Sequence, residues 1–217
     1  MTDNTARSLV AEDLPLREEI VRGLNGSPPA LPSRLFYDDR GARLFERICT
    51  LPEYYPTRCE LEILARALPE IAANLGPGCE VIEPGSGEGI KTRRLLAALD
   101  APRLYQPLDV AAEQLREAAA RLRTHFPALT VVPVVADFTK PLHLPAAVGR
   151  RVFFFPGSTI GNFPPQMAEE LLASWHADAG PEGQLLIGVD LRKDPQVLHA
   201  AYNDAAGVTA AFNRNIL

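Results

Sequence analysis

The sequence predicts an α/β protein in which a parallel β-sheet carries helices on both faces. Short apolar segments alternate with helix-forming segments between residues 80 and 190, and this alternation requires crossover connections that place helices on either side of a sheet. Several apolar segments end in an acidic residue or open into a glycine-rich turn, as strands do at the ligand-binding edge of such a sheet. With 217 residues, 47% of them hydrophobic, the chain is long enough for one substantial core and a small annex.

The individual elements are predicted from hydrophobic spacing and turn-forming residues. Strands are expected at residues 81–83, 104–108, 130–135, 151–155 and 184–189, and helices at residues 90–99, 111–124 and 165–178. Before them, residues 14–24 and 41–50 show helical spacing. Thr57 and Glu60 form a capping box for a further helix that runs to about Leu75. The region before the sheet is therefore expected to be mainly helical.

Composition and charge exclude several classes of function. The formal net charge is -5 and the pI is about 5.4, and no run of Lys or Arg supplies a phosphate-binding stripe, so we expect no nucleic-acid partner. No apolar run approaches the length of a membrane span, and the first residues lack the pattern of a signal peptide, so a cytoplasmic protein is expected. The cysteines and histidines show no disulfide framework and no metal-ligand spacing, which predicts reduced thiols and no metal.

A glycine-rich turn follows the first predicted strand of the sheet. Gly85, Gly87 and Gly89 stand before a predicted helix, where glycine permits a sharp turn and the free N–H groups of the helix can face a nucleotide-like ligand. A nicotinamide-type fingerprint would have its third glycine later, but position 90 is Ile. With the acidic Glu83 before it, the spacing instead resembles the first motif of S-adenosylmethionine-dependent methyltransferases. A purely structural strand-to-helix turn is the alternative.

Two further strand candidates end in an aspartate. Asp109 follows residues 104–108, at the distance where an open α/β sheet places an acid on a ribose diol, and Asp137 follows residues 130–135. Asp109 is expected to accept from ribose hydroxyls and Asp137 from the adenine amino group, with Phe138 covering the ring. Either aspartate alone would more often be a turn or N-cap residue. Three such strand ends in succession favour a ligand site.

Polar and aromatic residues in two loops are candidates for substrate contacts. Asn162, in the loop at residues 156–164, offers a donor and an acceptor without a charge, which suits a neutral α-amino group. Its alternative role is to tolerate a left-handed turn conformation. Tyr54 and Tyr55 lie between two prolines, directly before the helix that runs to about Leu75. Their alternative role, shared by Tyr202, is that of amphipathic residues at a domain seam.

Five segments together resemble the histidine N-alpha-methyltransferases of ergothioneine biosynthesis. They are residues 35–38 (LFYD), 51–58 (LPEYYPTR), 85–87 (GSG) with 91–93 (KTR), 157–162 (GSTIGN) and 201–213 (AYNDAAGVTAAFN), whereas residues 88–90 (EGI) depart from the pattern of the family. The resemblance covers the chain from about residue 30 to its end. It implies a class I methyltransferase (Rossmann-like) domain at residues 61–191, and a substrate domain to which residues 1–60 and 192–217 contribute. It further implies that the α-amino group of histidine is methylated with S-adenosylmethionine to give hercynine, the trimethylated betaine.

The resemblance also assigns roles to individual residues. The cofactor contacts of the family fall on Gly85, Lys91, Asp109, Asp137 and Phe138, with backbone help from Gly157, and the geometry of the turn adds Gly87. The histidine-binding residues of the family fall on Tyr54, Tyr202 and Asn162, with Tyr37 nearby. These residues would orient the amine for direct in-line displacement, which needs neither a metal nor a covalent nucleophile.

The C-terminus departs from the pattern of the family. Family members continue well past the position of Leu217, with the final antiparallel strands of the sheet and with residues that recognise the imidazole ring. We therefore expect a monomeric, C-terminally truncated chain whose strand at residues 184–189 has an uncovered edge. Two alternatives remain open: a related methyltransferase for another amino acid, and a non-catalytic cofactor-binding domain.

Overall fold

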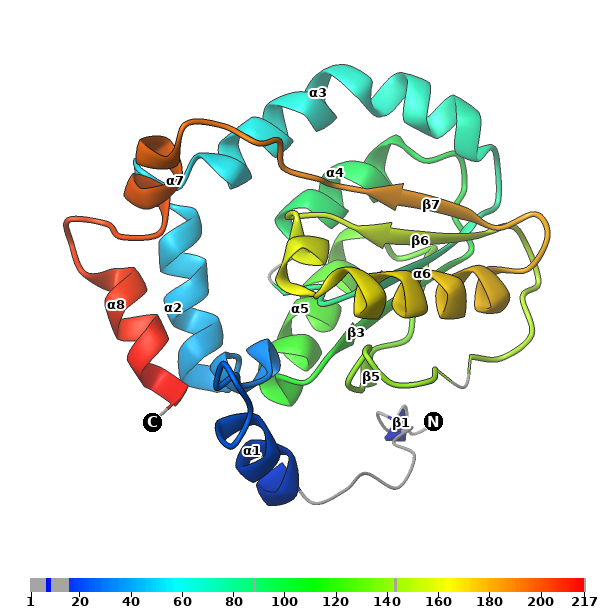
Figure 1. Cartoon of the computed structure of the whole chain (residues 1–217). Coiled ribbons are helices and arrows are strands. Elements are labelled where there is room, and N and C mark those ends of the chain that lie inside the picture. The colour runs from blue at the N-terminus through cyan, green and yellow to red at the C-terminus, as the bar shows by residue number, and fades with distance from the viewer. Residues whose placement is uncertain (1–6, 9–15, 88, 143, 217) are drawn as a thin grey trace.

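The structure, a computed structural model, describes residues 7–8, 16–87, 89–142 and 144–216 (Figure 1). Its helices are α1 (Leu16–Leu24), α2 (Asp39–Cys49), α3 (Tyr55–Leu75), α4 (Ile90–Ala98), α5 (Ala112–His125), α6 (Pro165–Ala179), α7 (Pro195–Ala201) and α8 (Val208–Asn213), with short 3-10 helices η1 (Ser33–Phe36), η2 (Thr159–Asn162) and η3 (Arg214–Ile216). Its strands are β1 (Arg7–Ser8), β2 (Glu80–Pro84), β3 (Leu104–Asp109), β4 (Thr130–Val131), β5 (Val134–Val135), β6 (Arg151–Phe155) and β7 (Gln184–Ile187).

The strands form one sheet in the order β1-β5-β3-β2-β6-β7, with β4 also paired to β3. Every pairing is parallel, and β2 lies at the centre between β3 and β6. Because parallel neighbours end at the same edge, the residues that follow β2, β3, β5 and β6 are brought together there. In Figure 1 this carboxyl edge faces α2, α7 and α8.

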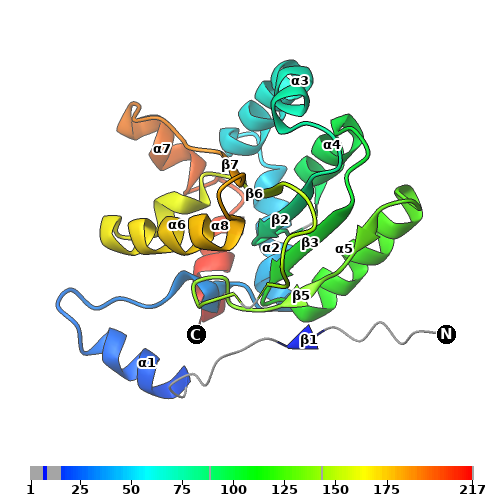
Figure 2. The same ribbon diagram turned by 90° about the vertical axis from the view of Figure 1, so that its right-hand side faces the viewer.

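Both faces of the sheet are covered by helices, and the side chains of β6 show why. Val152 and Phe154 enter a core cluster that includes residues of α3, α4 and α5, whereas Phe153 and Phe155 enter a second cluster with α6. Successive side chains of a strand point to opposite faces, so a strand buried on both sides is apolar throughout. Figure 2 shows α6 on one side of the sheet and α4 and α5 on the other. The predicted α/β architecture is confirmed.

A third apolar cluster lies beyond the carboxyl edge of the sheet. Ile48 of α2, Ala201 of α7, and Val208 and Phe212 of α8 are buried there, together with Tyr54. Segments that are far apart in sequence thus form one helical annex, because α2 and α8 each have too little apolar surface to be stable alone. This annex stands opposite the strand ends (Figure 1).

The structure corrects some of the predicted elements. The strand expected at residues 130–135 is divided into β4 and β5, because Pro133 has no N–H to donate to the sheet. The capping box of Thr57 is wrong: α3 begins at Tyr55, Tyr54 is its N-cap residue, and no side chain caps it. The strand expected at residues 184–189 ends at Ile187. The short strand β1, which pairs with β5, carried no signal in the sequence.

Candidate active site

The glycine turn after β2 is held against the end of β3. The N–H of Gly85 donates to the Leu108 carbonyl at 2.7 Å, and Gly85, Gly87 and Gly89 all have positive φ angles, of 67°, 50° and 72°. A Cβ atom at Gly85 would lie 3.3 Å from the Phe138 ring, whereas one at Gly87 would meet nothing within 4 Å. The turn therefore has the left-handed backbone that favours glycine, with open space beside Gly87 for a ligand.

Asp109, at the end of β3, lies beside this turn. Its carboxylate accepts from the N–H of Gly87 at 3.3 Å and from the N–H of Ala111 at 3.0 Å. Burial raises the pKa of Asp109, and these backbone donors act in the opposite direction. A carboxylate fixed in this way retains lone pairs for other donors, which is what a ribose diol requires.

Asp137 follows β5 at the carboxyl edge of the sheet. One of its carboxylate oxygens accepts hydrogen bonds and the other has no hydrogen-bond partner. Its Oδ1 accepts from the N–H of Thr139 at 3.0 Å and from the Thr139 hydroxyl at 2.6 Å. Its Oδ2 is buried with no hydrogen-bond partner, although the Nε of Arg34 lies at an ion-pair distance of 3.2 Å. A buried acceptor with spare capacity fits the amino group of an adenine ring. Phe138, next to it, packs edge-on against Phe155.

Glu83 lies beneath the turn and is almost completely buried, at 2% exposure. Its Oε2 accepts from the hydroxyls of Thr92 and Tyr105, each at 2.6 Å. Burial raises the pKa of this carboxyl to about 7, against the opposing effects of the two hydrogen bonds and of the Lys91 ammonium. Glu83, the acid before the glycines, thus supports the turn through its hydrogen bonds to α4 and β3.

Lys91 and Gly157 are brought together by Glu60 of α3. The Glu60 carboxylate accepts from the Gly157 N–H at 2.8 and 2.9 Å and forms an ion pair with the Lys91 ammonium. The sequence placed Glu60 in a capping box, so its position in the site was missed. No pattern of spacing could have indicated it, because its partners lie 31 and 97 residues away. The N–H of Gly157 is held by Glu60 and is therefore not free to donate to a ligand.

Three of the predicted substrate residues form an aromatic cluster over the annex. The rings of Tyr54 and Tyr202 meet edge to face with centroids 5.7 Å apart, and Tyr37 packs edge-on against Phe45 and Phe212. Burial raises the pKa of Tyr37 and of Tyr54, and the neighbouring Tyr202 raises both further. These two phenols are therefore neutral hydrogen-bonding groups near pH 7. Phe45 and Phe212, which line the cluster, were not predicted as site residues.

Asn162 lies in η2, after β6, with an exposed side chain. The left-handed positions of this loop are Gly157 and Ser158, with φ angles of 83° and 57°, and Asn162 is not among the residues with positive φ. Tolerance of a left-handed turn therefore does not explain this asparagine. The structure leaves its amide available to a ligand at the same edge of the sheet as the glycine turn.

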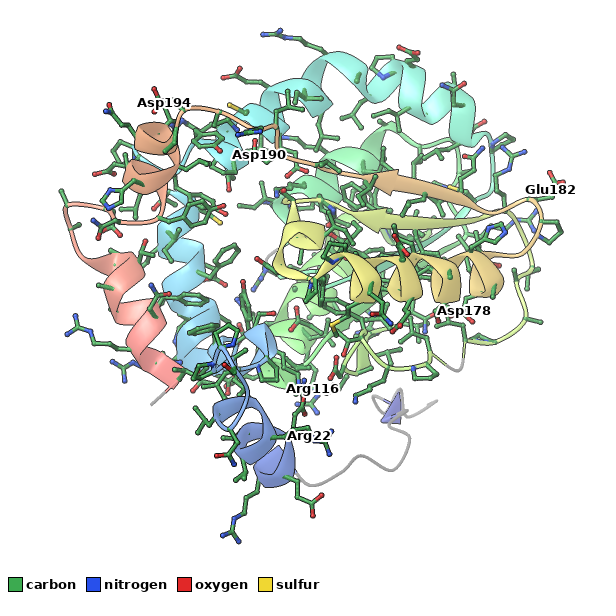
Figure 3. The ribbon with its side chains drawn as sticks, viewed as in Figure 1. Arg22, Arg116, Asp178, Glu182, Asp190 and Asp194 are labelled. Carbon is green, nitrogen blue, oxygen red and sulfur yellow. The ribbon has the colours of Figure 1, made fainter. Side chains whose placement is uncertain are left out.

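A second ion-pair group joins the start of α3 to the segment after β7. The Tyr55 hydroxyl donates to Asp190, and the Lys193 ammonium contacts both Asp190 and, at 2.8 Å, the Tyr55 hydroxyl. Asp190 also donates its backbone N–H to the Ser158 hydroxyl oxygen at 2.9 Å. Figure 3 shows Asp190 on the segment between β7 and α7, next to α3. The loop of Asn162 is thereby tied to the helix that follows Tyr54.

Comparison with known proteins identifies the family. The sequence profile of the histidine-specific, S-adenosylmethionine-dependent methyltransferases matches residues 16–217. This chain belongs to that family. The histidine methyltransferase family depends on S-adenosylmethionine, which confirms the predicted resemblance and the predicted cofactor.

Two curated members of the histidine methyltransferase family are similar over nearly the whole chain. The histidine N-alpha-methyltransferase of Mycolicibacterium smegmatis is 44% identical over 222 residues, which are 100% of this chain and 69% of that protein. The protein of the same name from Mycobacterium tuberculosis is 41% identical over 210 residues, 95% of this chain and 65% of that protein. The chain therefore spans about two thirds of the length of these relatives.

Solved structures confirm the fold of this family member. The magnesium protoporphyrin IX methyltransferase of Synechocystis, determined with bound S-adenosylmethionine, aligns with a TM-score of 0.50 at 14% identity. The alignment covers 81% of this chain and 86% of that one. At this identity the likeness establishes the class I methyltransferase fold. In the described part of the chain, no helix is long and apolar enough to cross a membrane, and no group of three potential metal ligands occurs.

Proposed function

We propose that this chain transfers methyl groups from S-adenosylmethionine to the α-amino group of L-histidine and gives the trimethylated product. The observation that carries the proposal is the meeting of two sets of residues at the carboxyl edge of the sheet. Asp109 and Asp137, hydrogen-bond acceptors that suit a nucleoside, lie at the ends of strands. The tyrosine cluster with Tyr54 lies opposite them, in the helical annex. Family membership supports histidine as the amino acid that lies between them.

In this proposal, different residues at the sheet edge contact different parts of S-adenosylmethionine. Asp137 accepts from the adenine amino group and Asp109 from the ribose hydroxyls, and Phe138 packs beside the ring. Lys91 supplies the cation that suits a carboxylate, which places the methionyl end of the cofactor by the glycine turn. The sulfonium of S-adenosylmethionine supplies an electrophilic methyl group at that end.

The substrate half orients the attacking nitrogen. Asn162 can accept from or donate to the amino acid without placing a charge beside its amine. Tyr54 and Tyr37 stay protonated near pH 7, so they act as hydrogen-bonding groups and not as proton acceptors. Aromatic faces also favour the quaternary ammonium that forms with the third methyl group. The main contribution of the protein is then the alignment of nitrogen and methyl carbon.

The proposal is tested by incubating the purified chain with S-adenosylmethionine and L-histidine and analysing the product by mass spectrometry. We expect successive addition of one, two and three methyl groups to the α-nitrogen. The N-alpha-acetylated amino acid serves as a control, because it presents no free amine. Binding of the cofactor without transfer to histidine, at protein concentrations comparable to those of the substrate, would contradict the proposed activity.

A related methyltransferase for another amino acid is the second candidate. Asn162 and the tyrosines favour this candidate, because their side chains can bind the amine and the carboxylate that all amino acids share. A panel of the twenty amino acids in the same assay separates the two candidates. Transfer to a different amino acid at a higher kcat/KM than to histidine would decide for the second.

A further inference from the structure

Glu60 contacts Lys91, a candidate cofactor-binding residue, and the loop of Asn162, a candidate substrate-binding residue. The proposed function gives Glu60 itself no role. It lies near the start of α3, six residues after the N-cap residue Tyr54. Its carboxylate holds the Lys91 ammonium through an ion pair and the Gly157 N–H through hydrogen bonds of 2.8 and 2.9 Å. Gly157 opens the loop that carries Asn162. One side chain thus connects three elements at the carboxyl edge of the sheet.

The surroundings of Glu60 are shaped to admit its carboxylate. A Cβ atom at Gly188 would overlap Glu60 Oε1, although Gly188 does not have a positive φ angle. Any side chain at position 188 would therefore displace the Glu60 carboxylate, and Gly188 leaves the space that this carboxylate occupies. A Cβ at Gly157 would likewise lie 3.2 Å from the Lys91 ammonium nitrogen. Two glycines on neighbouring strand ends therefore make room for this pair.

The environment makes the pair stronger than an ordinary surface ion pair. The side chains of Glu60 and Lys91 are only 17% and 20% exposed, so water and salt screen them less than exposed charges. Lys91 has a long, flexible side chain whose ammonium would otherwise sample several rotamers. A fixed counter-ion removes part of that freedom before a ligand arrives, which lowers the entropic cost of binding.

We propose that Glu60 is a positioning residue for the cofactor: it holds the Lys91 ammonium where the methionyl end of S-adenosylmethionine binds, and the hydrogen bonds from the Gly157 N–H keep the Glu60 carboxylate in place for this role. Asp109 and Asp137 suit ribose and adenine, so the carboxylate of the cofactor is the part that a cation must receive. Glu60 acts on it through Lys91. This inference rests on the proposed function, because it presumes the same cofactor in the same orientation.

The first test measures binding without turnover. The affinity for S-adenosylhomocysteine is determined by isothermal titration calorimetry for the wild type, Glu60→Gln and Glu62→Gln. Glu62 lies on the same helix with an exposed side chain, so it gives a matched control. We expect Glu60→Gln to weaken binding about tenfold, as for the loss of one charge-assisted hydrogen bond, and Glu62→Gln to change it less than about twofold.

The second test distinguishes positioning from general support of the fold. In steady-state assays, Glu60→Gln is expected to raise KM for S-adenosylmethionine by about the same factor, while kcat and KM for histidine change less than about twofold. In a Lys91→Met background, Glu60→Gln is expected to add less than about twofold, because its effect passes through the ammonium. Gly188→Ala displaces the Glu60 carboxylate without removing its charge and should reproduce the rise in KM.

Each outcome bears on one of the two proposals. Unchanged affinity in Glu60→Gln, or additive effects with Lys91→Met, would overturn the role of Glu60. Tighter binding would overturn it as well, because it would show that the Glu60 carboxylate competes with that of the cofactor for Lys91. If the folded wild type does not bind S-adenosylhomocysteine, the proposed function fails and this inference fails with it.

Discussion

The burial of Glu83 is expected to make the stability of the protein depend on pH. Its carboxyl is 2% exposed beneath the glycine turn, and burial raises its pKa from an ordinary 4.5 to about 7. In the unfolded chain the same group loses its proton near its ordinary pKa. A rise of this size corresponds to about 3 kcal/mol of free energy of unfolding, at 1.36 kcal/mol for each pH unit.

The sign follows from which state holds the proton. Below pH 4.5 the carboxyl is protonated in both states, so Glu83 adds no pH dependence to the free energy of unfolding. Between pH 4.5 and about 7 the unfolded chain loses the proton and the folded protein keeps it, so stability falls as the pH rises. Above pH 7 the loss is complete.

The variant Glu83→Gln isolates this contribution. Its amide oxygen can still accept from the Thr92 and Tyr105 hydroxyls, but it does not titrate. Urea unfolding followed by the fluorescence of Trp175, which is the single tryptophan and is buried, gives the free energy of unfolding at pH 5 and pH 8. We expect the wild type to lose about 2.5 kcal/mol more than the variant between these pH values.

Control and refutation use the same measurement. Glu62→Gln, an identical change at an exposed position, should keep the pH dependence of the wild type. Equal losses of stability in the wild type and Glu83→Gln would show that Glu83 is ionised in the folded protein, and the account of the buried acid would be wrong.

Three further predictions concern the two halves of the site. Asp109→Ala should weaken binding of S-adenosylhomocysteine by about 1.5–3 kcal/mol in calorimetry, the range for a lost hydrogen bond to a charged group, and unchanged affinity would remove Asp109 from the site. Asn162→Ala should lower kcat/KM for histidine at least about tenfold and leave cofactor affinity within about twofold, whereas equal loss of both would contradict a substrate role. Tyr55→Phe removes the donor to Asp190 and should lower the free energy of unfolding by about 1 kcal/mol in urea; a more stable variant would show that the hydroxyl is not needed there.

The regular part of the fold could be predicted from the sequence because it depends on local patterns. The apolar run of β6 indicates a strand buried on both faces, and the segment of α6 shows helical spacing, so both were predicted within about two residues. The same local patterns gave two wrong predictions. Pro133 divides a strand because it lacks an N–H. The helix expected to be capped by Thr57 begins three residues earlier, with Pro56 in its first turn.

The sequence indicated that the candidate cofactor residues would lie close together, but it did not indicate the side chains that support them. Gly85, Asp109 and Asp137 follow strands, and parallel strands that end at one edge must bring such residues together. The order of the strands does not show which other side chains hold these residues in place. Tyr105 meets Glu83 and Glu60 meets Gly157 across 22 and 97 residues, and no spacing in the sequence connects either pair.

The sequence by itself determined the family, the parallel sheet and the strand ends that carry the candidate ligand-binding residues, because these depend on residue type, periodicity and distinctive short segments. Only the tertiary structure decided that Tyr37, Tyr54 and Tyr202 join one cluster of aromatic rings, that Lys91 is held by Glu60, and that Glu83 is buried. The physical reason is that burial and ion pairing depend on the whole of the surrounding fold. A pattern of neighbouring residues fixes which way a side chain points, and packing fixes what it meets.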